Sequence, residues 1–155
     1  MNRCCDALVD GNTVYVRNGG GEKIYSYDVT SDSWSQLLPD CIYGKGAITV
    51  INGYLSTVGE YSRPTRTNEL FTLTGEGSSK RWTKILPPMP TKRRDTTALC
   101  IGTALIVAGG RGLGGRVLST VEVMNTENHH WSTAPDLPEP MYLASATVCG
   151  DQIYM

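Results

Sequence analysis

Short apolar runs separated by glycine-rich or polar turns recur along the whole chain. Segments such as VYVR, YLSTV and LIVA keep apolar residues together or in alternation for four or five positions, and each is followed by Gly or Asn. Runs of this length bounded by turn residues predict short β-strands. No stretch repeats apolar residues at the 3.6-residue spacing of an amphipathic helix over a useful length. The pattern therefore predicts an all-β chain.

The three tryptophans mark an internal repeat. Trp34, Trp82 and Trp131 are 48 and 49 residues apart, and each lies four to six residues before a Leu-Pro step. In each copy an apolar strand upstream of the tryptophan ends in glycine: at Gly19 and Gly20, at Gly59, and at Gly109 and Gly110. A regular period of about fifty residues is the signature of stacked supersecondary units.

Two alignments without gaps extend the repeat to both ends of the chain. Residues 3–19 align on residues 94–110, two repeats further on, and residues 144–155 align on residues 96–107. Each full unit divides into four predicted strands, and the last piece supplies two. The predicted strands are 4–9, 13–17, 23–28 and 33–37; 45–51, 54–58, 68–74 and 81–85; 95–101, 104–108, 118–125 and 130–133; and finally 143–148 and 152–155.

The recurring pattern resembles the kelch repeat. In that family a strand ends in Gly-Gly and a Tyr precedes the Trp by about seven residues, as Tyr27 precedes Trp34 here. The second copy departs from the pattern at Glu60 and Leu73, which stand where Gly and Tyr are expected. The resemblance covers essentially the whole chain. It implies an all-β fold: a kelch-type β-propeller segment of three four-stranded blades plus the first two strands of a fourth.

The expected organisation follows from the repeat. The whole chain, residues 1–155, forms a partial propeller, with blades at about 1–40, 41–90 and 91–140 and the start of a fourth at about 141–155. The glycines and tryptophans named above are the structural repeat positions. Each indole is large enough to pack between neighbouring blades, and we expect the three to occupy equivalent places.

An incomplete ring raises the question of what covers its ends. Propellers close with four to eight blades, and three and a half blades leave apolar sheet faces open, which favours association. Two copies closing one ring would bring two unfinished half-blades into the same space. We therefore expect a segment of a longer propeller, covered by the remaining blades of a longer chain, with self-association as the alternative that a size measurement distinguishes.

Charge and cysteine content limit the classes of binding partner and the cellular location that we expect. The net charge of −1 gives no general attraction to nucleic acid or membrane, and no run of 18 apolar residues is present. Residues 61–95, however, hold eight Lys or Arg and only three Asp or Glu. This stretch is either a solvated basic surface or a docking patch for an acidic partner segment. Five cysteines without metal-ligand spacing are expected to be reduced, which favours a cytoplasmic location.

The expected binding face is the one that carries the loops. In a four-stranded meander, the turns after the second and fourth strands open on the same face, where loops vary without disturbing the core. Arg and Tyr, which are favoured at interface hot spots, are frequent there. The predicted partner-binding residues are Tyr61, Arg63, Arg66, Arg93, Arg94, Arg111 and Arg116.

The family resemblance gives this face an expected role. In the similar kelch-like ubiquitin-ligase adaptors, a face lined by Arg, Ser and Tyr captures an acidic peptide. The resemblance therefore implies a protein–protein interaction scaffold, such as a substrate adaptor of a ubiquitin ligase or a cytoskeletal adaptor. A simpler interpretation, in which most of these side chains only face solvent, stays open.

Enzymatic interpretations find little support in the sequence. The GRGLGG segment at 110–115 fits a dinucleotide fingerprint, but a predicted strand follows it instead of the helix that such a site needs. The chain has two histidines, His129 and His130, which are adjacent in one turn and point apart. No catalytic, metal or cofactor site is predicted, and we expect a non-enzyme. The alternative is a fragment of a kelch-fold enzyme of the copper oxidase type, with catalytic residues on absent blades; sialidases would need repeated Asp-box turns, of which SDSW is a single faint match.

Overall fold

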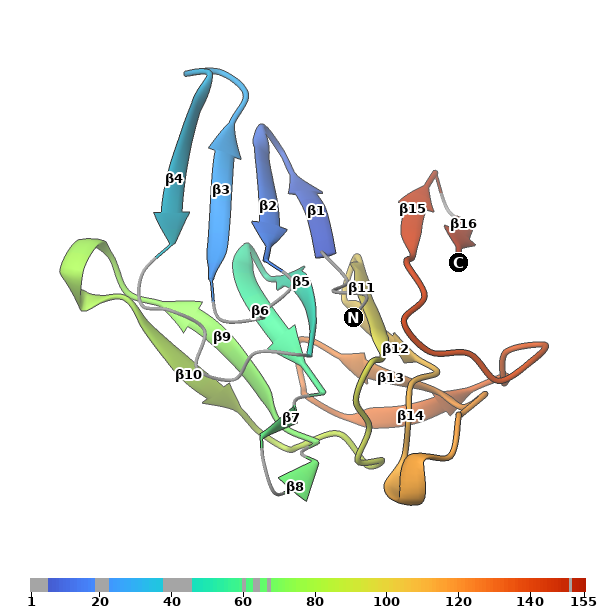
Figure 1. The fold of residues 1–155 in the computed structure, drawn as a ribbon. Coiled ribbons are helices and arrows are strands. Elements are labelled where there is room, and N and C mark those ends of the chain that lie inside the picture. Colours follow the sequence, from blue (N-terminus) through green and yellow to red (C-terminus); the bar gives the residue numbers. More distant parts are fainter. Residues whose placement is uncertain are drawn as a thin grey trace.

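The computed structural model describes residues 6–18, 23–37, 46–59, 61–62, 65–66, 68–150 and 152–155. These residues form three four-stranded sheets, and in each one the strands are antiparallel and follow one another as a meander. Figure 1 shows the sheets arranged around a common centre like successive blades. The predicted all-β architecture of three blades and the start of a fourth is confirmed for this part of the chain.

The strand bounds agree with the repeat. Blade 1 holds β1 (Asp6–Asp10), β2 (Thr13–Arg17), β3 (Ile24–Asp28) and β4 (Ser33–Leu37). Blade 2 holds β5 (Ala47–Ile51), β6 (Tyr54–Val58), β9 (Leu70–Thr74) and β10 (Arg81–Ile85). Blade 3 holds β11 (Thr97–Ile101), β12 (Ala104–Ala108), β13 (Val121–Asn125) and β14 (Trp131–Ala134). The start of the fourth blade is the hairpin of β15 (Thr147–Cys149) and β16 (Gln152–Tyr154).

Three short elements lie in the connections. A two-stranded hairpin, β7 (Tyr61–Ser62) and β8 (Thr65–Arg66), occupies the loop between β6 and β9, where the sequence predicted only a loop. Two 3-10 turns, η1 (Gly77–Ser79) and η2 (Leu113–Gly115), complete the set. No longer helix occurs among the described residues, and none there is long and apolar enough to cross a membrane.

Several predicted strands begin too early, including those predicted from residues 68 and 118, which start at Leu70 and Val121. For two others the backbone explains why. Strands predicted from residues 95 and 143 start instead at Thr97 and Thr147. Asp95 and Leu143, which are equivalent in the repeat, have left-handed φ angles of 53° and 54°. A left-handed residue cannot continue an extended strand, so the chain turns there before each inner strand begins.

The cores lie between blades. The first comprises Ile24 of blade 1 with Ile48 and Leu55 of blade 2, and Trp82 packs against it. The second joins Ile51, Val58, Leu70 and Met89 of blade 2 to Leu105, Val107 and Met124 of blade 3, and Trp131 packs against it. We call the side of a blade that meets the preceding blade its leading face, and the opposite side its trailing face. Burial on both faces explains why inner strands such as β5 (AITVI) and β12 (ALIVA) are apolar at nearly every position.

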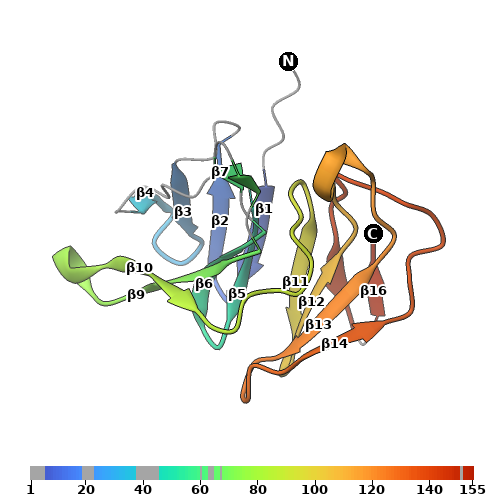
Figure 2. The same cartoon turned by 90° about the horizontal axis from the view of Figure 1, so that it is seen from below.

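The β-ladder register places the three tryptophans at equivalent positions, as predicted. Trp34, Trp82 and Trp131 lie opposite Tyr27, Leu73 and Met124 on the neighbouring strand. Each indole is on the outermost strand and on the leading face. Figure 2 shows these outer strands, β4, β10 and β14, at the far ends of the blades.

The surroundings of the three indoles differ. The Trp131 indole N–H donates a hydrogen bond of 3.2 Å to the carbonyl of Pro87, in the linker that leaves blade 2. Trp82 is partly buried against blade 1. Trp34 is 60% exposed, because no blade among the described residues covers the leading face of blade 1.

Substituting Trp131 by Phe is expected to lower the free energy of unfolding by about 1 kcal/mol, the net contribution of one hydrogen bond. The same change at Trp34 removes no interblade contact and is expected to have little effect. Chemical denaturation of the two variants, followed by far-UV circular dichroism, makes the comparison. Equal destabilisation by both changes would contradict the assignment of Trp131 as the member of the pair that a preceding blade covers.

Candidate partner-binding face

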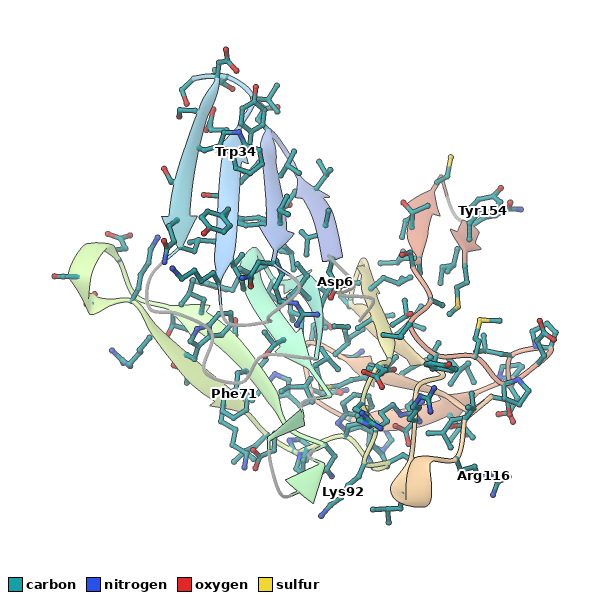
Figure 3. The ribbon with its side chains drawn as sticks, in the orientation of Figure 1. Asp6, Trp34, Phe71, Lys92, Arg116 and Tyr154 are labelled. Carbon is teal, nitrogen blue, oxygen red and sulfur yellow. The ribbon has the colours of Figure 1, made fainter. Side chains whose placement is uncertain are left out.

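The linkers between blades and the loops inside them meet at one end of the molecule. Figure 3 shows Lys92 and Arg116 at this end and Trp34 at the far end of blade 1. Arg94, in the linker entering blade 3, pairs with Arg111, in the loop after β12. Their backbones exchange two hydrogen bonds, of 3.1 Å from the Arg94 N–H and 2.7 Å from the Arg111 N–H. The backbone of Arg111 also forms an isolated antiparallel β-bridge with Val117. The extended segments at Arg94, Arg111 and Val117 therefore lie side by side.

The linker that leaves blade 3 joins the same group of segments. The Gly110 N–H donates to the Met141 carbonyl at 2.8 Å, and the Leu143 N–H donates to the Asp95 carbonyl at 2.9 Å. This approach depends on glycine, because a Cβ at Gly109 would lie 2.5 Å from the Met141 oxygen. The glycine pair after β12 therefore admits the next linker, and that linker carries Tyr142 to Arg111.

Four side chains from these segments form a cluster, which we call the Arg94–Tyr142 cluster: Arg94, Asp95, Arg111 and Tyr142. The Arg111 guanidinium lies 3.5 Å above the centre of the Tyr142 ring, a cation–π contact. One oxygen of Asp95 is 3.6 Å from Arg94 Nη1 and 3.8 Å from Arg111 Nε. Two cations thus share one carboxylate, which leaves the cluster net positive. Both arginines are partly exposed, and Tyr142 is exposed.

The structure separates the predicted contact residues into different groups. Arg94 and Arg111 come together, and Arg116 is exposed at the end of the η2 loop. Tyr61 and Arg66 lie in the β7–β8 hairpin, but their side chains are outside the described part of the structure, and so is the whole of Arg63. Among the predicted repeat positions, Gly19 and Gly20 are also outside the described residues.

Arg93 is placed differently from the expectation of a partner contact. Its side chain has 0% exposure and pairs with Glu122 at 3.0 Å. It also donates to the carbonyls of Gly109 and Thr120, at 2.9 and 2.8 Å. Neighbouring residues on an extended segment point to opposite sides, so Arg94 faces outwards while Arg93 anchors the linker inside blade 3. Arg93 therefore offers no surface to a partner, and we do not retain it among the candidate contacts.

Sequence reasoning did not single out Asp95 or Glu122. The adjacency of Asp95 to Arg94 was the available signal for the first. For Glu122, the signal was a lone carboxylate within the apolar run of β13, since a charge in such a run needs a buried partner.

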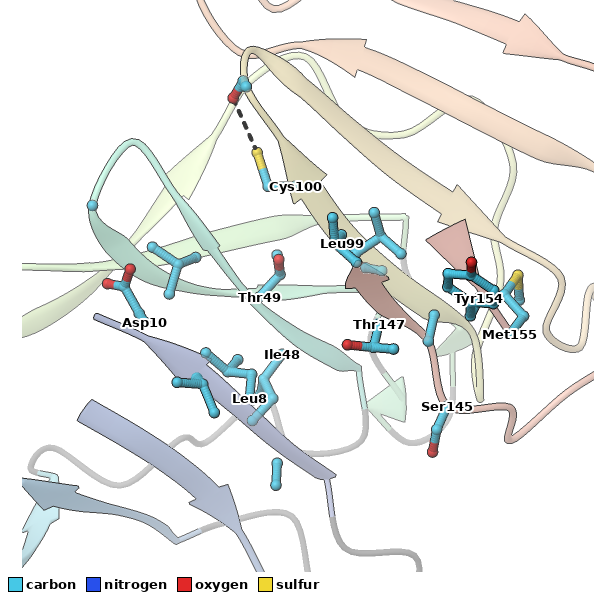
Figure 4. A pocket seen from close by; sticks show the side chains of 18 of the residues that line it. Leu8, Asp10, Ile48, Thr49, Leu99, Cys100, Ser145, Thr147, Tyr154 and Met155 are labelled. Atoms are coloured by element: carbon cyan, nitrogen blue, oxygen red, sulfur yellow. Dashed lines mark hydrogen bonds between the residues drawn. The ribbon is translucent and has the colours of Figure 1, made fainter. Parts of the chain in front are cut away.

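A central cavity lies between the inner strands β1, β5, β11 and β15 (Figure 4). Its volume is about 1000 Å³. Its described lining is made mostly of small apolar and hydroxyl side chains, with Asp10, Cys100 and Tyr154 as its titratable groups and no histidine. Burial raises the pKa of the Cys100 thiol, which disfavours the thiolate form that a nucleophile needs. Among the described residues, no group of three His, Cys, Asp or Glu side chains is placed to hold a metal ion.

Comparisons with known proteins agree with the observed blades. Residues 92–138, which span blade 3, match the kelch motif. Alpha-scruin of Limulus polyphemus is 26% identical to the chain over 87% of its length, and kelch-like protein 25 of Xenopus tropicalis is 22% identical over 96%. The chain spans only 15% and 28% of the lengths of these two relatives.

Proposed function

The chain belongs to the kelch-repeat family, and from this premise we propose that it is a protein-interaction scaffold whose loop face binds an acidic segment of a partner protein. The observation that carries the proposal is the Arg94–Tyr142 cluster. Its four side chains come from three connections that meet only in the folded blades. Loops held by a rigid sheet are the usual place for recognition residues.

The chemistry of the cluster favours carboxylates. A guanidinium offers several N–H donors in a planar fork that matches a carboxylate, and such charge-assisted hydrogen bonds are stronger than neutral ones. Stacking on Tyr142 holds the Arg111 group in one orientation, which lowers the entropy lost when a partner binds. Asp95 reduces the repulsion between the two arginines and leaves a net positive charge for an anionic partner.

Arg116 and Lys92 extend the positive surface. Both are exposed at the same end of the molecule as the cluster (Figure 3). Exposed charges at the edge of an interface mainly raise the association rate and are screened by salt. We therefore assign them a supporting role and place the affinity in Arg94 and Arg111.

The biological setting is a further part of the proposal. A kelch-like relative and a scruin both extend well beyond the length of this chain. We infer that these blades capture a partner on behalf of a larger cytoplasmic protein, as an adaptor and not as an enzyme. Substrate capture for a ubiquitin ligase and attachment to the cytoskeleton are the two roles that we propose for such an adaptor.

Reversing the charge of Arg94 and of Arg111 tests the proposal. Fluorescein-labelled nine-residue peptides carrying one to three Glu are titrated against the protein, with Gln versions of the same peptides as controls. Each reversal, Arg94→Glu or Arg111→Glu, is expected to weaken binding of the best acidic peptide about tenfold, the effect of one lost hot-spot contact. The readout is fluorescence anisotropy at two salt concentrations.

The matched control is Arg81→Glu, which changes an exposed arginine on the outer strand β10, away from the loop face. It should leave the affinity for the peptide within about twofold, apart from the general effect of net charge. Acidic and Gln peptides that bind alike, or equal losses from Arg81→Glu and Arg111→Glu, would refute an acidic segment as the ligand of this face.

A further inference from the structure

The loop between β12 and β13 presents a leucine to solvent beside the Arg94–Tyr142 cluster. Leu113 is 73% exposed, the highest value for a large apolar side chain among the described residues. From its position we propose that the partner segment is amphipathic. It places an apolar side chain on Leu113, within about three residues of the carboxylate that pairs with Arg94 and Arg111. This inference rests on the proposed function and adds a second recognition element to it.

The backbone that carries Leu113 is fixed by its own hydrogen bonds. A single exposed leucine does not by itself indicate an interaction site. Here, however, the Gly112 N–H donates to the Arg116 carbonyl at 2.8 Å, and the Gly115 N–H donates to the Gly112 carbonyl at 3.1 Å. These bonds close the η2 turn around Leu113. The side chain therefore lies at the tip of a preformed loop, which lowers the entropy lost when a partner binds.

The base of the same loop packs closely on blade 3. Gly112 is buried, and a Cβ there would lie only 3.2 Å from the Leu118 side chain. The Leu118 N–H also donates to the Gly110 carbonyl at 2.9 Å. The GRGLGG segment, which fits a dinucleotide fingerprint in sequence only, thus forms a tight loop anchored through Leu118. Leu113 is the apolar side chain that this anchoring leaves in solvent.

Leu113 lies between two cations of its loop. Arg111 precedes it by two residues, and Arg116 follows it by three. Two residues of chain span at most about 7 Å, so the backbones of Arg111 and Leu113 are no further apart than this. An extended partner segment advances about 3.3 Å per residue. A carboxylate at Arg111 and an apolar side chain at Leu113 therefore come from nearby positions of one partner segment.

The weakness of exposed ion pairs explains why an apolar contact belongs to this site. Arg94 and Arg111 have side-chain exposures of 28% and 29%, and water reaches both. An ion pair that stays in contact with water contributes little to affinity. The same pair strengthens when neighbouring apolar groups exclude water from it. An apolar partner residue placed on Leu113 supplies that shielding beside Arg111.

A double-mutant cycle on the full chain tests the inference. Fluorescein-labelled nine-residue peptides carry Glu at the centre and one Leu, which is moved through the three positions on each side. The remaining positions are Ser and Gly. The best of these peptides is expected to bind about fivefold more tightly than the peptide without Leu, because part of a leucine side chain is buried. In Leu113→Ser that gain should fall below about twofold, as measured by fluorescence anisotropy.

The matched control is Val29→Ser, which also replaces an exposed apolar side chain by a hydroxyl. Val29 is 56% exposed in the turn between β3 and β4, at the far end of blade 1 from the loop face (Figure 1). This variant should keep the full gain from leucine. With the unsubstituted protein, the gain should also persist at high salt, which screens the charges but not the apolar contact.

The outcomes separate this inference from the proposed function. Acidic peptides that lose affinity in Arg111→Glu but gain nothing from leucine would overturn the inference and leave the proposed function in place. A leucine gain that is as large in Leu113→Ser as in the unsubstituted protein would do the same. Peptides in which Gln replaces Glu without loss of affinity would refute the acidic ligand, and the inference with it. A gain lost in Leu113→Ser and kept in Val29→Ser supports both.

Discussion

Replacing Glu122 by Ala is expected to destabilise the protein by about 3–5 kcal/mol, because it leaves the Arg93 guanidinium charged and unpaired in the interior. Arg93 has 0% and Glu122 only 5% side-chain exposure, and their charged groups are 3.0 Å apart. Burial lowers the pKa of Arg93, and the Glu122 carboxylate opposes that effect. A guanidinium nevertheless stays charged near neutral pH. Loss of a proton therefore does not relieve the free-energy cost of burying the unpaired charge in the variant.

The loss should be compared with that of an exposed pair. Glu69→Ala breaks the ion pair with Lys84, in which both side chains are partly exposed, and is expected to cost about 0–1 kcal/mol. Urea denaturation monitored by circular dichroism gives both values. The double variant Arg93→Met/Glu122→Leu removes both charges and should be less destabilised than Glu122→Ala alone. Similar losses from Glu122→Ala and Glu69→Ala would contradict the role of the buried pair.

Substituting Gly109 by Ala is expected to cost about 2–5 kcal/mol, from a left-handed backbone and a steric clash together. The φ angle of Gly109 is 62°. A Cβ there would lie 2.5 Å from the Met141 carbonyl oxygen, which belongs to the linker leaving blade 3. Relief of that clash requires the linker to move, and with it Tyr142.

Gly114 provides a matched control for the steric part. Its φ angle is 70°, and a Cβ would meet no atom within 4 Å. Gly114→Ala should therefore cost only the backbone term, about 1–2 kcal/mol. Thermal unfolding followed by circular dichroism distinguishes the two variants. If both glycines gave the same loss, the close approach of the linker would not be what requires Gly109.

Both predictions concern one junction in blade 3. Arg93 donates to the carbonyl of Gly109, and the linker that contains Arg93 continues into Arg94. Damage at either position should therefore loosen the Arg94–Tyr142 cluster as well as the fold. The binding variants Arg94→Glu and Arg111→Glu, by contrast, change partly exposed side chains and leave this interior anchor untouched.

The repeat made most of the fold predictable. Trp34, Trp82 and Trp131 recur at a constant spacing because each must occupy the same place on the outer strand of its blade. Strand bounds followed wherever a turn residue stopped an apolar run, as at the turn formed by Asn52 and Gly53, where both residues have a positive φ. Two of the boundary errors fall at Asp95 and Leu143, where non-glycine residues adopt a left-handed backbone that composition does not reveal.

The candidate site was only partly predictable. The sequence predicted an arginine-rich binding face on the loops, which stays a prediction, and it treated Arg93 and Arg94 as one kind of residue. Arg93 is buried and Arg94 is partly exposed because only one side of the extended linker faces Glu122, a residue 29 positions away from Arg93. The contact of Arg111 with Tyr142 likewise depends on two linkers crossing beside a glycine.

By itself, the sequence determined the period, the strands and the identity of the repeat, because these follow from local spacing and turn chemistry that every blade repeats. Only the tertiary structure decided which arginine is buried, which side chains form the cluster, and that Trp34 is exposed while Trp131 is covered. Those properties depend on contacts between segments far apart in the chain. Identical local sequence signals therefore acquire different roles according to what lies against them.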